Sequence, residues 1–401
     1  MKKILPLLLI LCLLCACAAP EKEHDLSTYE ANGYYTVLAS DTVLYEYGGA
    51  AVPELILSDK ALEPQWITFE KAADGGYTRT AAEDYTFSKE NQTSAYRLFR
   101  DDASSGTKVY PEQFALCELD GKYYYSVGGL TVNDGYSASS DGKIMVFEGN
   151  DGRLLQYKPE ADTLTAVGSD SYGTLSYTDA AKGWIVDFAL SEDGRYAAYT
   201  STRRTAAQKA PQTDLWLCSL ENGEEKLLTE NVSVFSGLDF DGTRLFYCTI
   251  GASEGTSAYT YIGMDVTDGT QLSIDWDNSY TTVKNGWICG QNKVYNIAEQ
   301  KAYTVDSTVD GSARKGILSE DGKYTVTLYG DEENLYVKVV EVETSQPTVF
   351  LLPGDFKNEF LDFHLLDMRE GKILLQCMLY NADKSGDFTA YYTVDLSWGL
   401  K

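Results

Sequence analysis

The fold class is indicated most clearly by LSEDGRYAAYT at residues 190–200, together with TDLWLCSLENGEEKLLTEN at 213–231. Asp193 and Gly194 predict a tight turn, because Asp-Gly pairs supply the positive φ angles that such turns need. The alternating apolar residues after Gly194 predict a strand that is buried on one or both faces. The second stretch predicts an outer hairpin that turns at Asn222 and Gly223. Together they predict one small antiparallel sheet.

The same unit recurs along the chain. Copies of the turn and its strand are SSDGKIMVFEG at 139–149, LDFDGTRLFYCT at 238–249 and LSEDGKYTVTLY at 318–329, with weaker copies VKNGWICG at 283–290 and MREGKILLQCML at 368–379. Outer hairpins of the same design are GRLLQYKPEADTLTAVG at 152–168, KVYNIAEQKAYTV at 293–305 and NLYVKVVEVETSQPTVFLL at 334–352. The turn glycines are 36 to 52 residues apart, a spacing typical of four-stranded propeller blades.

We therefore predict an all-β protein and, within that class, a β-propeller with seven blades of four antiparallel strands. Eight or six blades are the alternatives, and a pair of β-sandwiches is the alternative architecture. Residues 30–139 fit the repeat only loosely, through ELDGKYYYSVGG at 118–129. We expect this region to supply one or two irregular blades and the strand that closes the ring, since an open ring leaves unpaired sheet edges.

The repeat resembles the TolB-like family of β-propellers, which are similar in architecture to WD-repeat propellers. The family unit runs S-x-D-G-x-x-apolar-apolar-aromatic and then D-apolar-W/Y, G-G-E and L-T. The copies at 190–200 and 213–229 match it closely, and the resemblance covers roughly residues 140–398. The proline common before the Asp in the family is replaced here by Glu192, Glu320 or Phe240, which marks diverged copies. The resemblance implies a propeller, and relatives often serve in protein assemblies of the cell envelope.

The N-terminus predicts export and a lipid anchor. Lys2 and Lys3 precede an apolar run at residues 4–14, which is too short to span a bilayer, since a span needs roughly 20 apolar residues. Leu14-Cys15-Ala16-Cys17 resembles the lipobox of bacterial lipoproteins, which implies that Cys17 receives diacylglycerol and becomes the mature N-terminus. Cys15 is an unusual occupant of its place. The alternative is an ordinary secretory signal that is cleaved near Ala19.

These features predict three regions and a location. They are a signal peptide at residues 1–16, a flexible tether at 17–30 and the propeller at 31–401. The predicted location is the extracytoplasmic face of a bacterial cell membrane. Loss of the signal peptide removes two positive charges from a chain whose net charge is already −27. Phosphate backbones repel such a surface, so we expect no nucleic-acid partner.

One stretch formally matches a serine nucleophile. Gly251-Ala252-Ser253-Glu254-Gly255 has the G-x-S-x-G pattern, and His364 follows later in the chain. That pattern needs a strand, a turn and then a helix to expose the serine. The residues that follow, TSAYTYIGMDV at 256–266, predict another strand. We therefore expect a Gly/Ser loop between two strands and a strand histidine, and predict no catalytic residue.

The sequence predicts no metal site and no cofactor. The histidines beyond the signal are His24 and His364, and the cysteines beyond Cys17 form no CxxC pair, so a zinc site is excluded. Five cysteines follow the anchor, and one disulfide is possible without an assignable pairing: Cys117, Cys218, Cys248, Cys289 and Cys377. Residues 381–387, NADKSGD, resemble the start of a calcium loop, but Tyr392 stands where that loop needs Glu. A polar hairpin turn explains this stretch equally well.

Two functions follow from these predictions. The first is a lipid-anchored, non-catalytic binding or scaffold protein for a protein or glycan partner. The alternative is a carboxylate-dependent, glycan-processing enzyme on a propeller scaffold. The ligand-binding residues and the partner are unknown from the sequence, because function in such folds lies in loops grafted on the scaffold.

Overall fold

The structure is a computed structural model. It describes residues 35–37, 42–46, 53–58, 65–71, 77–81, 112–126, 136–148, 154–168, 185–205, 208, 213–230, 232, 237–253, 256–275, 282–290, 292–305, 308–309, 312–313, 316–330, 335–352, 360–380, 387–397 and 399–400. Within these ranges the chain forms β-strands and one short helix, α3 (Pro53–Leu57).

The described strands form seven antiparallel sheets of one design, which we call blades 1 to 7. Blade 1 contains β3 (Gln65–Lys71), β4 (Tyr77–Ala81), β5 (Glu112–Leu119) and β6 (Lys122–Ser126). Blade 2 contains β7 (Tyr136–Ala138), β8 (Met145–Glu148), β9 (Leu154–Lys158) and β10 (Thr163–Ala166). Blade 3 contains β11 (Ile185–Leu190), β12 (Tyr196–Ser201), β13 (Asp214–Ser219) and β14 (Glu225–Thr229). Blade 4 contains β15 (Leu238–Asp241), β16 (Arg244–Ser253), β17 (Thr256–Asp265) and β18 (Gln271–Asp275).

The other three blades follow in chain order. Blade 5 contains β19 (Thr282–Lys284), β20 (Trp287–Cys289), β21 (Lys293–Asn296) and β22 (Lys301–Thr304). Blade 6 contains β25 (Ile317–Leu318), β26 (Tyr324–Gly330), β27 (Leu335–Glu341) and β28 (Pro347–Leu351), with β1 (Tyr35–Val37) added at its edge. Blade 7 contains β29 (Phe360–Arg369), β30 (Lys372–Tyr380), β31 (Asp387–Asp395) and β2 (Thr42–Glu46). A small hairpin, β23 (Thr308–Val309) and β24 (Ser312–Ala313), lies between blades 5 and 6 in the chain.

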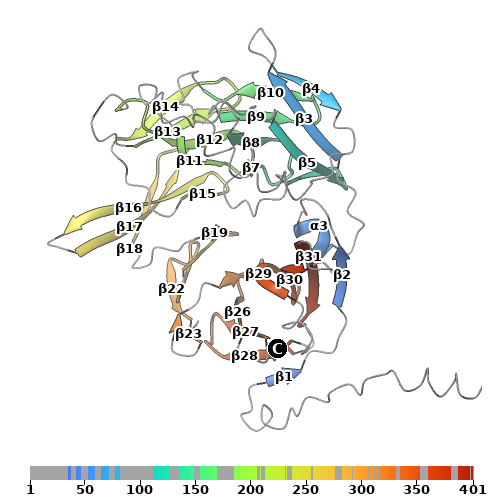
Figure 1. The fold of residues 1–401 in the computed structure, drawn as a ribbon. Helices are drawn as coiled ribbons and strands as arrows, with labels where there is room; N and C mark the ends of the chain where they lie inside the picture. Colours follow the sequence, from blue (N-terminus) through green and yellow to red (C-terminus); the bar gives the residue numbers. More distant parts are fainter. Residues whose placement is uncertain are drawn as a thin grey trace, which may run out of the picture.

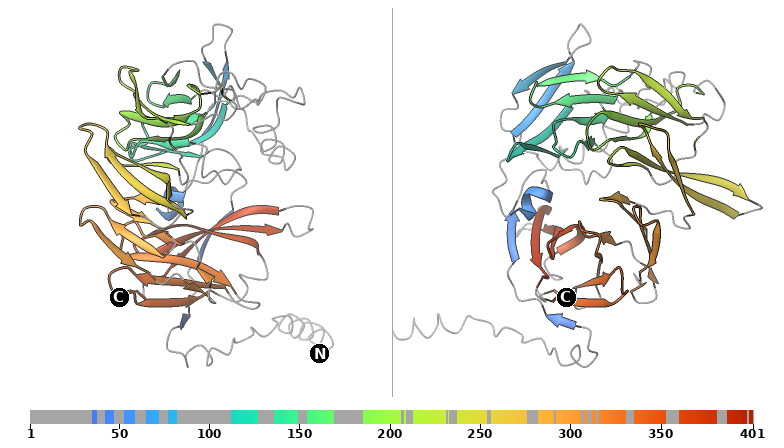
Figure 2. Two further views of the ribbon diagram at one scale, coloured as in Figure 1. Left: turned by 90° about the vertical axis from the view of Figure 1, so that its left-hand side faces the viewer. Right: turned by 180° about the vertical axis from the view of Figure 1, so that it is seen from behind.

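The blades follow one another around a common centre (Figure 1). The first strands of neighbouring blades contact each other, as β11 and β15, β15 and β19, and β25 and β29 do, so these strands are the innermost ones. The β16–β17 hairpin extends outward from the rim in several views (Figures 1 and 2). The prediction of an all-β propeller with repeated four-stranded antiparallel sheets is confirmed.

Blade 1 departs from the common strand order. Its hydrogen-bonded order is β4-β3-β5-β6, whereas blades 2 to 5 keep the order of the chain. The Asp120-Gly121 turn therefore joins the last two strands of this blade instead of the first two. The prediction that residues 30–139 supply an irregular blade is confirmed.

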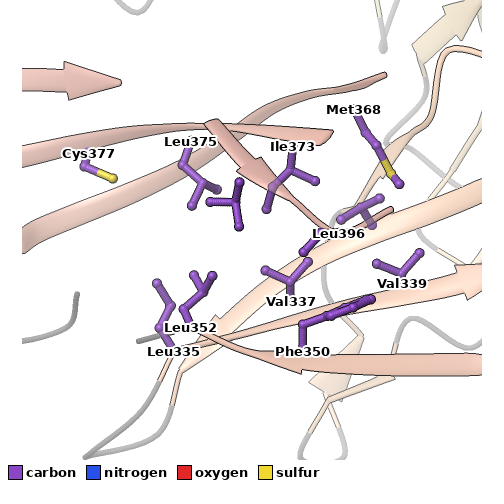
Figure 3. Close-up of a cluster of buried hydrophobic side chains, with 12 residues drawn as sticks. Leu335, Val337, Val339, Phe350, Leu352, Met368, Ile373, Leu375, Cys377 and Leu396 are labelled. Carbon is purple, nitrogen blue, oxygen red and sulfur yellow. The ribbon is translucent and has the colours of Figure 1, made fainter. Parts of the chain in front are cut away.

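Buried apolar clusters join each blade to the next. Blades 6 and 7, for example, share a cluster in which Val337 and Phe350 face Ile373 and Leu375 (Figure 3). The six junctions from blade 1 to blade 7 contain, in order, Phe69 with Tyr157, Leu154 with Tyr199, Leu217 with Phe240, Phe246 with Ile288, Cys289 with Leu318, and Val337 with Leu375. The core is thus divided among the junctions, and each blade is stabilised by both of its neighbours.

Helix α3 fills the junction between blades 7 and 1. Ile56 is fully buried and packs with Leu57 against Leu374 and Tyr391 of blade 7. On the other side, Leu55 packs against Cys117 of blade 1. Proline suits the first helical position, where its missing N–H group is not needed, and the helix begins with Pro53. This helix is absent from the sequence predictions.

Both ends of the chain contribute to blade 7. Strand β2 pairs with β31 in antiparallel fashion over five residue pairs, from Thr42 with Val394 to Glu46 with Ala390. Strand β1 pairs in parallel with β28 of blade 6. The predicted closing strand from the N-terminal region is therefore present.

The cysteines whose side chains the structure describes are buried thiols: Cys117, Cys218, Cys289 and Cys377. Burial raises the pKa of Cys117 to about 11 and that of Cys377 to about 12. A buried thiol with a raised pKa is a poor nucleophile and behaves as a small apolar side chain.

Candidate functional site

The Ser-x-Asp-Gly turns are built by one set of hydrogen bonds. In blade 3 the Ser191 hydroxyl donates to Asp193 Oδ1 at 2.8 Å, and the same oxygen accepts the Arg195 N–H at 3.0 Å. The Tyr196 N–H donates to Ser191 Oγ at 3.0 Å, and Gly194 adopts a φ of 69°. The turns at 139–144 and 319–324 repeat these bonds at 2.8–3.1 Å. The side chains thus fix the turn backbone in three blades.

The turn aspartates are stabilised as carboxylates. Burial acts to raise the pKa of Asp193, but the Arg195 N–H, the Ser191 hydroxyl and the Arg195 guanidinium outweigh burial and hold that pKa below its usual value. The pKa values of Asp141 and Asp321 are lowered in the same way, by their own backbone and hydroxyl donors. The turns therefore present charged groups in fixed positions.

Consecutive turns are bonded to one another, and we call them together the turn belt (residues 120–123, 139–144, 191–196, 241–244, 284–287, 319–324 and 368–371). The links in chain order are Tyr123 N–H to Asp141 O at 3.0 Å, Ser140 N–H to Glu192 O at 2.8 Å, Glu192 N–H to Gly242 O at 3.3 Å, Gly286 N–H to Asp241 Oδ1 at 2.8 Å, Asn285 Nδ2 to Glu320 O at 2.9 Å, and Glu320 N–H to Met368 O at 3.1 Å. These bonds place the seven turns on one face of the ring.

Polar side chains also bond the innermost strands to each other. The Leu190 N–H donates to Ser137 Oγ at 2.9 Å, and the Leu238 N–H donates to Asp187 Oδ2 at 2.6 Å. The Val283 N–H donates to Asp239 Oδ2 at 2.9 Å. In each case the acceptor belongs to the preceding blade. A strand edge needs such partners, because its outward N–H groups have no neighbouring strand.

Three of the inner carboxylates, Asp187, Asp239 and Asp241, interact electrostatically. The pKa of Asp239 is raised to about 7, mainly by burial and in smaller part by the carboxylates of Asp187 and Asp241, against the lowering effect of the Val283 and Phe240 N–H groups. A carboxyl group of this kind has the pKa of a general acid. Both of its oxygens, however, accept backbone N–H groups that join or shape the blades.

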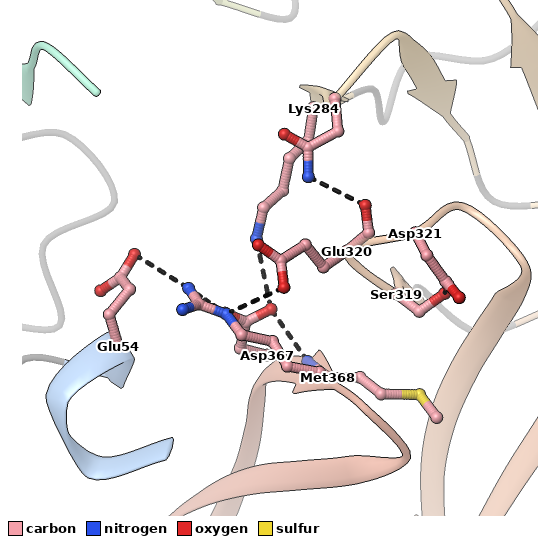
Figure 4. Close-up of polar contacts among 9 residues, drawn as sticks. Glu54, Lys284, Ser319, Glu320, Asp321, Asp367 and Met368 are labelled. Carbon is pink, nitrogen blue, oxygen red and sulfur yellow. Dashed lines mark hydrogen bonds and ion pairs between the residues drawn. The ribbon is translucent and has the colours of Figure 1, made fainter. Parts of the chain in front are cut away.

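A second cluster lies where blades 5, 6 and 7 meet helix α3 (Figure 4). Asp367 on β29 has only 7% of its side chain exposed and accepts Lys284 Nζ at 3.2 Å, Arg369 Nη2 at 3.0 Å and the Met368 N–H at 2.9 Å. Arg369 also lies 3.4 Å from Glu54 and 3.7 Å from Glu320. Since blade 6 separates Lys284 from Asp367, this ion pair connects two blades that are not neighbours.

The arrangement of these groups suits stabilisation of the ring. Glycan cleavage by carboxylates needs a pair about 5–10 Å apart, one of which delivers its proton to the substrate. The inner carboxylates Asp187, Asp239 and Asp241 accept N–H groups of the next blade, and Asp367 accepts two cations. Each therefore has a partner within the ring that explains its position.

The described residues of the formal G-x-S-x-G match do not lie in the strand–turn–helix setting that exposes a nucleophilic serine. Gly251, Ala252 and Ser253 are the last residues of β16, and Ser253 pairs with Thr256, the first residue of β17. The prediction of a second strand after this motif is confirmed, although these three residues belong to the strand instead of a loop. His364 is exposed on β29 opposite Gln376, with Phe363 and Leu365 packed on the core.

Several predictions concern residues outside those that the structure describes. These are the signal peptide, Cys17 with its tether, and residues 381–386 of the possible calcium loop. The strands beside that loop pair from Tyr380 with Asp387 onward, as a hairpin requires. Over the described ranges, no three His, Cys, Asp or Glu side chains gather in a way that could hold a metal ion. The described helix is too short to span a membrane.

The inner-strand acceptors are the residues that sequence reasoning missed. Asp187 lies 51 residues before the N–H group that it accepts, and Asp239 lies 44 residues before its own donor. Asp187 precedes its turn glycine by seven positions and Asp239 by three. No constant spacing marks them, so the repeat pattern could not have revealed them.

No family model and no curated protein matches this sequence. Solved structures do match its fold. An oligogalacturonate lyase in complex with manganese is 14% identical over 84% of this chain and 98% of its own, with a TM-score of 0.42. An oligogalacturonate lyase from Vibrio parahaemolyticus is 10% identical over 82% and 97%, with a TM-score of 0.42. A chain of a nidogen/laminin complex is 11% identical over 73% and 95%, with a TM-score of 0.32.

These likenesses concern the fold alone and carry over neither an activity nor a ligand. The seven sheets of this chain, joined in cyclic order by their clusters and by α3, make it a β-propeller.

Proposed function

We propose that this protein is a lipid-anchored, extracytoplasmic β-propeller that binds a protein or glycan partner without catalysing a reaction. The use of the inner carboxylates carries the proposal. Asp187, Asp239 and Asp241 accept N–H groups from the next blade, and Asp367 accepts Lys284 and Arg369. Carboxylates that are bonded within the ring stabilise the scaffold, and recognition of a partner is then left to the exposed turns and loops.

The turn belt is the surface on which we place the partner. Its backbone is fixed by the bonds within and between turns, while the side chains of Lys143, Arg195 and Lys323 are exposed. Each of the three follows a turn aspartate by two positions. A preordered surface with both charges binds a polar protein or glycan with little loss of conformational entropy.

Replacement of Cys17 tests the membrane part of the proposal. We expect Cys17→Ser to move the protein from the membrane fraction to the soluble extracytoplasmic fraction, because the serine oxygen does not accept the lipid. Cys15→Ser is the matched control and is expected to stay in the membrane fraction. Membrane retention of Cys17→Ser equal to that of the native protein would refute the anchor.

The released Cys17→Ser protein then serves as bait to test binding. We expect affinity capture from envelope extracts, followed by mass spectrometry, to recover a partner. Substitution of Lys143, Arg195 and Lys323 by Ala should abolish capture, since Ala keeps the backbone N–H groups of the turns. The control replaces Lys158, Lys226 and Lys301, which lie on or next to outer strands, and should leave capture unchanged. Glycan turnover by the bait, without recovery of a bound partner, would contradict the binding proposal.

A further inference from the structure

Arg244 lacks the carboxylate partner that every other arginine with a described side chain has. Those ion pairs are Arg195 with Asp193, Arg203 with Glu225, Arg204 with Asp214, and Arg369 with Asp367. Arg244 forms no ion pair with a described residue, although the chain has 60 acidic and 33 basic residues, and its Nε is buried without an acceptor. A buried donor without a partner destabilises a fold, so stability does not account for this arginine.

The stem of Arg244 lies in a space that Gly263 leaves open. Arg244 precedes Phe246 by two positions on β16, so both side chains lie on the face toward blade 5, where Phe246 packs against Ile288. A Cβ added to Gly263, the register partner of Phe246, would lie 3.1 Å from Arg244 Cδ and 2.6 Å from a ring carbon of Phe246. With its stem and Nε covered, this partly exposed residue reaches the turn belt through its terminal nitrogens.

An acceptor lies beside these donors. Asp241 is the register partner of Arg244 on β15, and directly opposed residues have Cβ atoms about 5 Å apart. Asp241 Oδ1 accepts the Gly286 N–H of blade 5 at 2.8 Å, which fixes the carboxylate at the junction, whereas Oδ2 accepts no hydrogen bond from the described residues. Asp265, opposite Arg244 on β17, differs because both of its oxygens accept threonine hydroxyls. The belt end of this junction thus offers free donors and one free acceptor.

We propose that Arg244 and Asp241 form a sugar-binding site on the turn belt, at the junction of blades 4 and 5. A hydroxyl group both accepts and donates hydrogen bonds, so neighbouring hydroxyls of one sugar ring bond the guanidinium and the carboxylate together. An anionic ligand would be repelled by Asp241 and Asp265 and by a chain whose net charge is −27. The ligand class is therefore a neutral glycan. This site rests on the proposed function and narrows its partner.

The rest of the turn belt favours a glycan over a protein. Its exposed side chains are charged or polar, whereas its apolar side chains are buried or partly buried. Stable protein interfaces usually centre on apolar or aromatic residues that the partner covers, and the belt exposes none fully. Polar groups on a backbone that hydrogen bonds already fix suit a ligand rich in hydroxyl groups.

Thermal unfolding of Arg244→Met, made in the full Cys17→Ser protein, separates binding from folding. Met keeps an apolar stem over Gly263 and removes the unpaired guanidinium, so we expect a Tm equal to or above that of the parent. The matched control is Arg204→Met, which leaves the fully buried Asp214 carboxylate without its cation and should lower the Tm by roughly 5 °C. A fall in the Tm of Arg244→Met as large as that of the control would overturn the proposal.

Calorimetric titration with maltotriose, cellotriose, mannotriose and chitotriose tests the ligand class. We expect at least one of these neutral sugars to bind the Cys17→Ser protein. Arg244→Met and Asp241→Asn should each weaken that binding about tenfold or more, since the Asn amide keeps an acceptor for Gly286 but loses the free one. Lys226→Ala, on an outer strand, should leave it unchanged.

Three results would overturn the sugar site. They are binding of none of the four sugars, sugar binding that survives Arg244→Met, and capture of a protein partner by a bait that binds no sugar. The third result would leave the proposed function in place. Cleavage of a bound sugar, in contrast, would overturn both the site and the proposed function.

Discussion

A chain shortened to begin at residue 48, and so lacking β1 and β2, is expected to lose most of its folded population. The loss removes the five residue pairs between β2 and β31 and the three between β1 and β28. At about 0.5–1.5 kcal/mol per net hydrogen bond, the β2 pairs alone stabilise the ring by roughly 5 kcal/mol. Folded domains are stable by only about 5–15 kcal/mol, so little stability remains.

Equilibrium urea unfolding, followed by tryptophan fluorescence, measures this effect. The matched control begins at residue 31, which removes the predicted signal and tether but keeps both strands. We expect the control to unfold at the urea concentration of the Cys17→Ser protein, whereas the shorter chain starts largely unfolded or aggregates through the open edge of β31. Equal midpoints for the two shortened chains would show that β1 and β2 do not close the ring.

The second large effect is expected from Gly142→Ala in the turn of blade 2. Gly142 has a φ of +66°, and a Cβ there would lie 1.7 Å from the carbonyl oxygen of Tyr123 in blade 1. A substitution must therefore push two blades apart in addition to straining the turn. We expect a destabilisation of about 2–4 kcal/mol, of which strain at positive φ accounts for about 1 kcal/mol.

Gly121→Ala isolates the strain from the contact between blades. Gly121 has a φ of +78°, but nothing lies within 4 Å of a Cβ built there. We expect its cost to be about 1 kcal/mol. Unfolding free energies from urea titration give both values, and a cost for Gly142→Ala no greater than that for Gly121→Ala would contradict the close approach of blades 1 and 2.

The parts of the fold that were predicted are those with local signals. Asp193-Gly194 and Asn222-Gly223 specify turns through backbone angles that few other residue pairs adopt, so each turn predicts two strands without reference to the rest of the chain. The repeat of these signals then predicts the blade. Helix α3 has no such signal, because its five residues are too few to show a helical period. Its place is decided by apolar contacts with two distant blades.

The candidate site was less predictable for a related reason. Asp187 and Asp239 accept N–H groups of the following blade, and Asp367 accepts the ammonium group of a lysine that lies 83 residues away in the sequence. Such contacts depend on ring closure, and single positions in the sequence do not encode them. The formal G-x-S-x-G match shows the reverse case, because its described residues, Gly251–Ser253, lie in a strand of a hairpin that does not suit the chemistry of a nucleophilic serine.

In the proposed function the inner carboxylates join blades and do not process a substrate. Asp187→Asn separates these two roles when Tm and glycan turnover are measured on the same purified sample. The amide offers one acceptor where the carboxylate serves both the Leu238 and the Phe188 N–H groups, so we expect a loss of about 1–3 kcal/mol. We expect Asp187→Asn to have a lowered Tm, and both the native and the variant protein to show only background glycan turnover. Turnover by the native protein that disappears in Asp187→Asn at an unchanged Tm would contradict the proposed function.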